Sequence, residues 1–483
     1  MKGLNHTISG LLGDFYLLSP ELVLIGGAIL LAILQLVIKA EDHQIKRIVT
    51  LFILLITGWF VACCQADGFW MNDILFHSGN AAWMKYLILL TAGSILLFPN
   101  SKKLLIRGEY HFLILMVVLG TFMLMQSANL LVFYISIELI SITSYVLIAF
   151  NFDKKSFEAG IKYLLFGAMA SGLMLYGISL LYGMTGSLDL PDLKNVLVGQ
   201  NIWIVLSLVM FLMGLLFKLA IAPMHIWSPD AYEGGPTPIV ALISVAPKAA
   251  VLMFLYHFIN ISGLESIAFD WKKLLAILAL ISMFLGNLSA LRQDNLKRML
   301  AYSSIAHSGF LVLGLLPGTQ LGYQAMMFYL MAYGIMNVGA FYLAGLMEKN
   351  GVYKISSLSG TGRSNPLLAV SVVVIMVALV GLPPTAGFTA KLLVFSSIYE
   401  MFNQTQDGYL LWLFGLGILN AGISLFYYLK LPYFMIIKES KEASINITLS
   451  ERVFLFLACI ILLWLFFQAD LLLNILNPTN FAF

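Results

Sequence analysis

The sequence predicts an all-α polytopic membrane protein with ~14 transmembrane helices, and two observations support that prediction. Hydrophobic residues make up 60% of the 483 residues and charged residues only 11%, whereas about 25% of the residues in soluble domains are charged. Apolar windows of ~20 residues, long enough to span a bilayer, recur along the chain with short connections. Fourteen such windows lie near residues 22–38, 49–65, 81–98, 110–126, 128–150, 158–183, 201–225, 238–260, 273–291, 298–316, 321–346, 366–398, 409–437 and 452–476.

The first window and the cysteines exclude several classes of protein. No small-residue cleavage site follows residues 22–38, so we expect a spanning helix and not a signal peptide. Cys63, Cys64 and Cys459 lie in apolar stretches without a CxxC or Cys/His cluster, and we expect them to be core residues. The sequence also lacks a glycine-rich phosphate loop. A soluble enzyme, an iron–sulfur or zinc site and a nucleotide site are therefore not expected on this chain.

Basic residues in the connections predict the orientation, because positively charged loops stay in the cytoplasm. Seventeen lie in odd-numbered connections, and four lie in even-numbered connections or the N-terminal tail. We therefore expect the odd connections to be cytoplasmic and both termini to lie on the outer side. The odd group is Lys39, Lys46, Arg47, Lys102, Lys103, Arg107, Lys154, Lys155, Arg292, Lys297, Arg298, Lys349, Lys354, Arg363, Lys438, Lys441 and Arg452, and the other is Lys2, Lys194, Lys272 and Lys273.

Two similar stretches, 159–167 and 325–333, indicate an internal repeat with an offset of 166 residues, or five helices. An odd number of helices makes two copies face opposite ways across the membrane, an architecture that places transport sites near the midplane. The expected division is N-terminal helices in 1–109, two five-helix repeats in 110–260 and 273–437, and a C-terminal helix in 438–483.

Two of the predicted helices, the seventh and the twelfth, are interrupted. Pro223 follows Lys218 in helix seven, and Pro383 and Pro384 precede Lys391 in helix twelve. Proline removes a backbone donor, and a broken helix is tolerated in a bilayer only where protein or water satisfies the freed groups. We therefore expect a hydrated site beside a lysine in each half.

Four charged residues lie near the middle of spanning windows: Glu138, Lys218, Lys248 and Lys391. A charge at that depth costs roughly 2.5–3.5 kcal/mol, and lysine is the cation that loses its proton most readily when buried. The pattern indicates a proton path along the membrane plane. Lys218 is the expected partner of Glu138, and separating such a pair would release a proton. The alternative is a structural ion pair that locks two helices together.

The sequence also indicates an environment for Lys248 and roles for Lys162 and His307. The carbonyl freed by Pro247 is expected to bind either the ammonium of Lys248 or a water. Lys162 lies near a helix end and either snorkels to the surface or joins the path. Histidine suits a proton shuttle, and His307 is the expected relay between Lys248 and Lys391 through water, although a lone histidine such as His257 is more often a core residue.

Four further charges receive structural interpretations. Lys85 and Lys430 lie nearer helix ends and are expected to be interfacial anchors. Asp230 and Glu233 are expected to cap and order the connection before helix eight.

The stretch from Lys218 to Pro238, KLAIAPMHIWSPDAYEGGPTP, closely resembles the signature of the antiporter-like subunits of respiratory complex I. Glu138, Lys248 after a proline, and GLPPTAGFTAK ending at Lys391 resemble that family too. The resemblance covers about helices four to thirteen, and the family includes Mrp-type cation/proton antiporter and membrane-bound hydrogenase subunits. The chain is too short for the long lateral helix of one member type, and Lys391 stands where another type typically has glutamate.

The resemblance implies a proton-translocating subunit of a NADH–quinone oxidoreductase in a bacterial inner membrane. NADH oxidation and quinone reduction would occur on FMN, iron–sulfur clusters and a quinone pocket in other subunits, with no cofactor on this chain. The implied partners are the other antiporter-like and small helical membrane subunits and the lipid bilayer, with no nucleic acid. Protons would enter from the cytoplasm, charge Lys248, pass to Lys391 and leave on the outer side.

Three alternatives remain open at this point: a subunit of a Na⁺/H⁺ antiporter, a membrane arm of a hydrogenase or formate-oxidising complex, and a membrane scaffold whose lysines only hold helices together. The two halves also differ, because the offset of 166 residues places Glu138 on Ser304 and Lys218 on Pro384. The second half therefore has no equivalent acid.

Overall fold

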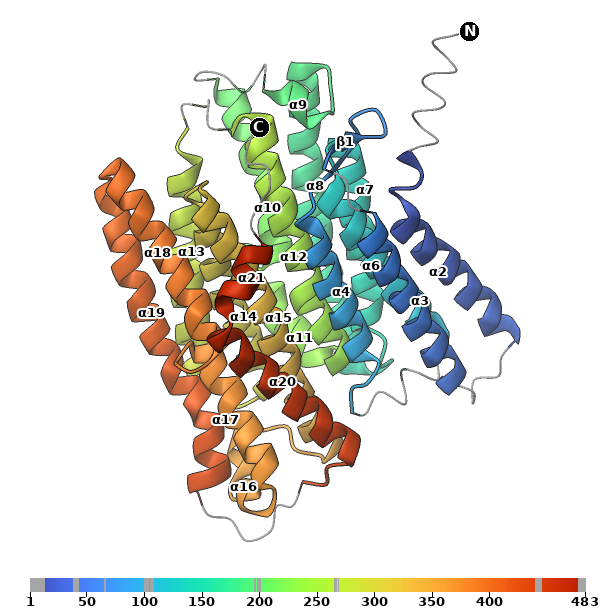
Figure 1. Ribbon diagram of the computed structural model, residues 1–483, viewed down its shortest axis with the longest axis vertical. Helices are drawn as coiled ribbons and strands as arrows, with labels where there is room; N and C mark the ends of the chain where they lie inside the picture. The colour runs from blue at the N-terminus through green and yellow to red at the C-terminus, as the bar shows by residue number, and fades with distance from the viewer. Residues whose placement is uncertain are drawn as a thin grey trace.

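The computed structural model is a bundle of helices that run roughly along one direction (Figure 1). It describes residues 14–37, 43–64, 67–99, 104, 108–194, 197, 201–264, 267, 269–438 and 445–476. Eleven of the described helices are long and apolar enough to cross a membrane, and two shorter apolar helices, α4 (Ala81–Ile95) and α17 (Pro366–Val380), accompany them. The predicted helical membrane protein is confirmed at this level, whereas the count of fourteen spans stays a prediction.

The helices follow the predicted apolar windows in order. The first half contains α2 (Ser19–Val37), α3 (His43–Cys63), α4, α6 (Gly108–Gln126), α7 (Leu130–Ile148), α8 (Lys154–Thr185), α9 (Leu190–Leu193), α10 (Ile202–Leu219), α11 (Trp227–Gly234) and α12 (Thr237–Ser262). The second half contains α13 (Trp271–Leu291), α14 (Leu296–Leu315), α15 (Gln320–Lys349), a 3₁₀ turn (Ile355–Leu358), α16 (Thr361–Ser364), α17, α18 (Ala386–Thr405), α19 (Gly408–Pro432) with a π turn (Tyr433–Ile437), α20 (Leu449–Phe467) and α21 (Ala469–Ile475).

Three predicted windows are divided in the structure. The window 201–225 ends as a helix at Leu219, because Ala220 takes a positive φ of 55° and the short helix α11 follows. The window 366–398 is divided between α17 and α18, where Gly381 has a φ of 84° and two prolines follow it. The window 452–476 is divided at Gln468 into α20 and α21, without a proline or glycine at the break.

A small β-hairpin was not predicted. Strands β1 (Gly68–Trp70) and β2 (Leu75–His77) pair antiparallel between α3 and α4. The turn between them contains Met71, Asn72 and Asp73, all with positive φ. Asparagine and aspartate tolerate that conformation, so the Asn-Asp pair between apolar residues was the available signal.

Helix α12 forms the centre of the molecule. It is apolar on every side, which predicts burial all round, and its spanning window is wholly buried. It packs against α4 and α6 of the first half and α14 and α15 of the second. Figure 1 shows α2 and α3 at one edge of the bundle and α18 and α19 at the other. This packing places Lys248, in the middle of α12, at the core of the protein.

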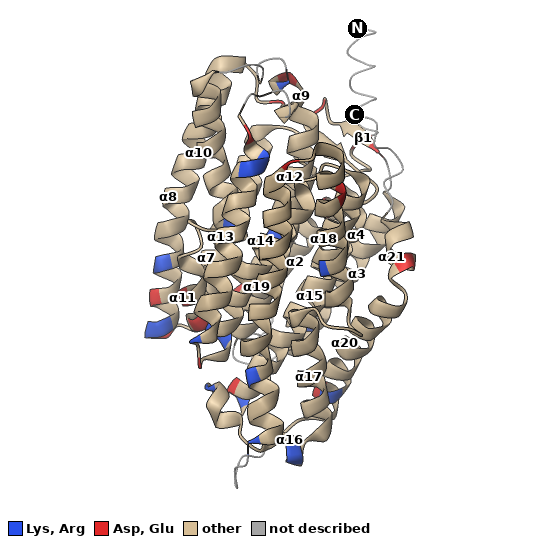
Figure 2. Ribbon diagram, turned by 90° about the vertical axis from the view of Figure 1, so that its left-hand side faces the viewer, with Lys and Arg blue, Asp and Glu red and all other residues tan. Residues whose placement is uncertain are grey.

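Charged residues gather at the end of the bundle that contains α11, α16 and the start of α14 (Figure 2). We call this end, defined by Lys155, Lys297, Arg298, Lys349 and Arg363, the basic end. It is the predicted cytoplasmic side. Both termini and the basic residues Lys2, Lys39, Lys102, Lys103, Arg107 and Lys441 lie outside the described residues. The orientation and the division into repeats stay predictions.

Candidate functional site

Lys218 lies in the last turn of α10, next to the first helix break. Its side chain is buried, and its Nζ has no hydrogen-bond partner among the described residues. The rings of Tyr145 and Tyr163 lie 5.6 and 5.5 Å from Nζ. Aromatic faces attract a cation through their quadrupole. Ring faces therefore contact the ammonium where a hydrogen-bonded counter-ion could stand.

Glu138 lies in the middle of α7 and is half-buried. Its Oε1 has no hydrogen-bond partner among the described residues, and Lys218 makes no ion pair with it. Glu138 is nevertheless close enough to act electrostatically on Lys218. The pairing of the two residues therefore stays a prediction, without a hydrogen bond or ion pair between them among the described residues.

Lys248 donates three hydrogen bonds to the neighbouring helix α14. Its Nζ lies 2.8 Å from the carbonyl oxygen of Ser304, 2.6 Å from the hydroxyl of Ser304 and 2.7 Å from the hydroxyl of Ser308. The side chain is 1% exposed. The predicted partner, a carbonyl freed by Pro247 within α12, does not bind it, because the ammonium points across to α14. All three acceptors are neutral, so Lys248 also lacks a counter-ion.

His307 lies between these two serines on α14 and is buried. Its Nδ1 is 2.8 Å from the hydroxyl of Tyr329, and its Nε2 is 3.0 Å from the hydroxyl of Tyr428. Both Lys248 and Lys391 are close enough to act electrostatically on the ring. The structure therefore brings together the three residues of the predicted relay, with tyrosine hydroxyls at both ring nitrogens of the histidine.

Lys391 lies in α18 beside the second helix break. Its Nζ donates to the carbonyl oxygen of Val380, at 2.5 Å, where α17 ends. The ring of Phe310 on α14 lies 4.9 Å from the same atom. A carbonyl freed by the end of a helix thus takes the place of an acidic partner, a contact that was not predicted.

A second hydrogen-bonded chain joins Lys248 to α15 and was not predicted. The hydroxyl of Tyr333 is 2.8 Å from that of Ser304, and Asn337 donates to Tyr333 at 3.1 Å and to Ser244 at 2.6 Å. All four of these polar side chains are buried. The tyrosine in the repeated Ala/Gly/Tyr stretch of α15 was the only signal in the sequence.

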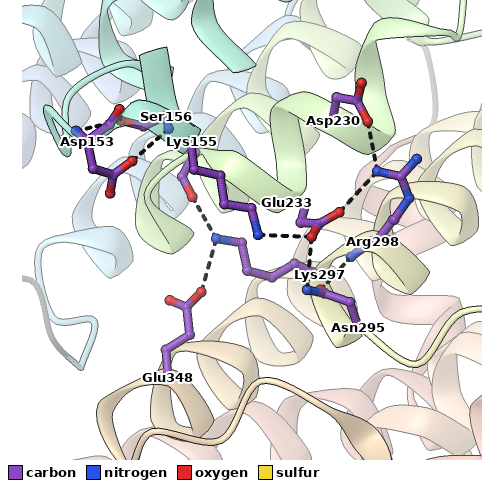
Figure 3. Close-up of polar contacts among 10 residues, drawn as sticks. Asp153, Lys155, Ser156, Asp230, Glu233, Asn295, Lys297, Arg298 and Glu348 are labelled. Carbon is purple, nitrogen blue, oxygen red and sulfur yellow. Dashed lines mark hydrogen bonds and ion pairs between the residues drawn. The ribbon is translucent and has the colours of Figure 1, made fainter. Parts of the chain in front are cut away.

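Lys162 does not belong to this interior network. Its side chain is 42% exposed and forms ion pairs with Glu158 and Asp230. Arg298 of α14 binds Asp230 at 2.7 Å and Glu233 at 3.0 Å (Figure 3). The two acids therefore tie α11 to α8 and α14 through side chains instead of capping a helix as predicted.

The ion pairs decide the protonation of the two acids on α11. Partial burial raises the pKa of Asp230, but hydrogen bonds from Lys162 and Arg298 outweigh that effect and hold its pKa below the ordinary value. Burial likewise raises the pKa of Glu233, and hydrogen bonds from Lys155 and Arg298 bring its pKa below the ordinary value. Both carboxylates are therefore charged at neutral pH.

A buried ion pair in the first half was missed. Lys85 was predicted to be an interfacial anchor, but it is 1% exposed and binds Glu21 of α2 at 2.9 Å. Gln126 of α6 donates to the same carboxylate oxygen at 2.6 Å. The second oxygen of Glu21 has no partner among the described residues. Glu21 was the available signal, because an acid in an apolar helix needs a partner.

Two expectations from the sequence, that the chain holds no metal site and that its cysteines are core residues, concern the described part of the chain. It contains no group of three or more His, Cys, Asp or Glu side chains that could hold a metal ion. Cys63 is exposed, contrary to the expectation that all three cysteines lie in the core, whereas Cys64 and Cys459 are buried.

Comparison with known proteins gives consistent results. The family described as NADH:quinone oxidoreductase/Mrp antiporter, transmembrane, matches residues 127–419. The chain is 37% identical over 448 residues to NADH-quinone oxidoreductase subunit N 2 of Chloroherpeton thalassium, with 88% of this chain and 86% of that protein covered. It resembles a chain of respiratory complex I from Thermus thermophilus, solved with bound aureothin, with a TM-score of 0.79 at 30% identity, covering 95% and 100% of the two chains. A chain of an archaeal membrane-bound sulfane sulfur reductase shares the fold, with a TM-score of 0.85 at 23% identity over 96% of both chains.

Proposed function

Because this chain belongs to the NADH:quinone oxidoreductase/Mrp antiporter family of membrane subunits, we propose that it is the subunit-N-type proton-translocating member of a bacterial NADH–quinone oxidoreductase. Its identity to curated subunit N proteins extends over most of both chains. That likeness favours the oxidoreductase over the sodium antiporter and hydrogenase alternatives.

One observation supports proton transfer most directly: three buried lysines, Lys218, Lys248 and Lys391, lack an acidic partner in hydrogen-bond contact. A buried ion pair fixes both of its charges. Without a counter-ion, burial brings the free energies of the charged and neutral forms of a lysine closer together. Each of the three lysines can then gain and lose a proton with a small change in its surroundings.

The steps of transfer follow the contacts on α14. Approach of Glu138 to Lys218 would hold both charged, and their separation would make Lys218 give up its proton. Neutral Lys248 would then accept a proton through the hydroxyl of Ser304 and pass it, through water and His307, toward Lys391. At each hydroxyl or ring one proton is gained and another lost, so only the lysines change charge.

The energy would come from partners. In this proposal, NADH oxidation on FMN and iron–sulfur clusters and the reduction of quinone occur in other subunits, and this chain responds through contacts with the adjacent membrane subunits. Glu138 is half-buried, and a partly accessible side chain suits such a contact. We also propose that the basic end faces the bacterial cytoplasm and that both termini lie on the outer side, in accord with the distribution of basic residues.

The experiment that tests the proposal is NADH-driven acidification of inverted membrane vesicles that carry Lys218→Ala, with the content of assembled complex measured in parallel. We expect NADH oxidation and pumping to collapse together at normal complex content. Lys218→Arg should also fail, because arginine keeps its proton. The matched control is Lys273→Ala, which removes a half-exposed lysine paired with Asp270 and should pump normally.

Each unfavourable result has a definite meaning. If Lys218→Ala supports normal NADH-driven activity, the proposed function is wrong, and sodium–proton exchange is the next activity to assay. If Lys218→Arg restores pumping, the residue serves as a fixed cation and does not carry protons.

A further inference from the structure

A cavity of about 400 Å³ opens at the basic end and takes no part in the relay described above. It lies where α11 meets α12, between the start of α14 and the end of α15. Its polar lining includes Thr237 and four residues that Figure 3 shows, Glu233, Asn295, Lys297 and Glu348. Acids and a lysine at the edge of a membrane protein hold water and exchange protons with it, so this cavity is a hydrated space on the predicted cytoplasmic side.

Lys297 fastens the inner wall of the cavity. Its Nζ donates to the carbonyl oxygen of Gly235 at 2.6 Å and to Glu348 at 3.0 Å. Thr237 donates to the other oxygen of the same carboxylate. The lysine is 7% exposed, and it joins three segments: the start of α14, the turn before α12 and the end of α15. Its loss would free the helices that border the cavity.

The cavity lies at the start of α12, and an apolar layer of that helix separates it from Lys248. Residues 238–243 of α12, Pro-Ile-Val-Ala-Leu-Ile, have no polar side chain, and at 1.5 Å per residue the seven steps from Thr237 to Ser244 span ~10 Å. Beyond that layer the polar side chains resume. Ser244 accepts a hydrogen bond from Asn337, which also donates to the hydroxyl of Tyr333. The hydroxyl of Tyr333 is hydrogen-bonded to Ser304, which accepts from Lys248.

We infer that this cavity is the vestibule from which protons reach Lys248, and that Lys297 is the residue that closes it. The inference rests on the proposed function and assigns its entry point. Release of Lys297 from Gly235 would let water enter between α12 and α15 as far as Ser244. A hydronium ion there would give up one proton. Tyr333 and Ser304 would each accept a proton and donate another, and neutral Lys248 would become an ammonium.

The test is cysteine accessibility from the basic end, because labelling needs neither NADH nor turnover. Ser244→Cys is introduced into the assembled complex in a background whose three native cysteines are replaced by alanine. Inverted vesicles are treated with a membrane-impermeant methanethiosulfonate. We expect slow labelling with Lys297 present and labelling about tenfold faster with Lys297→Ala, which corresponds to a shift of ~1.4 kcal/mol toward the open arrangement. The matched control is Ser262→Cys, equally buried at the other end of α12, which should stay unlabelled in both backgrounds.

Other results would overturn the inference. Labelling of Ser244→Cys at one rate with or without Lys297 would exclude Lys297 as the closing residue. Labelling of Ser244→Cys only in right-side-out vesicles would place the entry at the opposite end. If Lys297→Ala does not assemble, Thr237→Val makes the same test, because it removes a second contact of Glu348 and keeps every charge. Absence of labelling both with and without Lys297 would refute the vestibule alone, because labelling does not depend on NADH, whereas the proposed function stands or falls with the Lys218→Ala vesicles.

Discussion

Ser304→Ala tests whether the contacts of Lys248 with α14 serve proton transfer. The substitution removes one of the three hydrogen bonds of the ammonium and leaves the backbone carbonyl of residue 304 and the hydroxyl of Ser308 in place. A hydrogen bond to a charged group is worth about 1.5–3 kcal/mol. If the charged form of Lys248 is an intermediate in pumping, its destabilisation by that amount slows the step by about 10- to 150-fold.

The assay is NADH-driven acidification of inverted vesicles, with the rate divided by the content of assembled complex. The matched control is Ser207→Ala, an equally buried serine whose hydroxyl binds only a carbonyl of its own helix. We expect the control to pump at the normal rate and Ser304→Ala to pump at least about 10-fold more slowly. Equal rates in the two variants would refute the role given to Ser304 and, with it, the step through α14.

Three further predictions concern other parts of the molecule. Lys85→Met leaves Glu21 buried without its cationic partner, which should destabilise the protein by about 3–5 kcal/mol and lower the content of complex on native gels. The double variant Lys85→Met with Glu21→Gln should recover part of that loss. The pKa values of Asp230 and Glu233 are lowered in the folded state, so their ion pairs stabilise the fold fully above the ordinary carboxyl pKa of about 4 and lose that effect as the pH falls through the lowered values. The melting temperature of the solubilised protein should drop in that acidic range, and it should drop less in Arg298→Gln. Tyr428→Phe removes a hydroxyl from His307 and should slow pumping without changing complex content; an unchanged rate would argue against the histidine relay.

The helices could be predicted because a bilayer imposes a strong length and composition rule on the chain. The breaks at Pro223 and at Pro383–Pro384 were visible for a similar reason, since proline cannot continue a helix hydrogen-bond pattern. Both breaks lie beside a lysine in the structure as in the sequence. The hairpin before α4 was missed because its strands have three residues each and lie between long apolar windows.

The partners of the charged residues could not be predicted, because the sequence does not say which helices are neighbours. Lys248 was assigned to a carbonyl of its own helix, but its acceptors are 56 and 60 residues away on α14. Lys85 was assigned to the surface by its distance from the helix end, whereas its side chain is buried and pairs with Glu21 of α2. Position along a helix gives depth in the membrane, and only the packing gives the direction of the side chain.

Helix α14 contacts charged residues both at the basic end and in the core of the protein. Its first turn carries Lys297 and Arg298, which bind acids at the basic end. On its middle turns, Ser304 and Ser308 accept from Lys248, and His307 is close enough for Lys248 to act on it electrostatically. A helix transmits a displacement along its length because its backbone hydrogen bonds resist local distortion. In the proposed mechanism, a shift of α14 that breaks the outer ion pairs would also move the acceptors of Lys248, so that entry of a proton and the readiness of the lysine to accept it would change together.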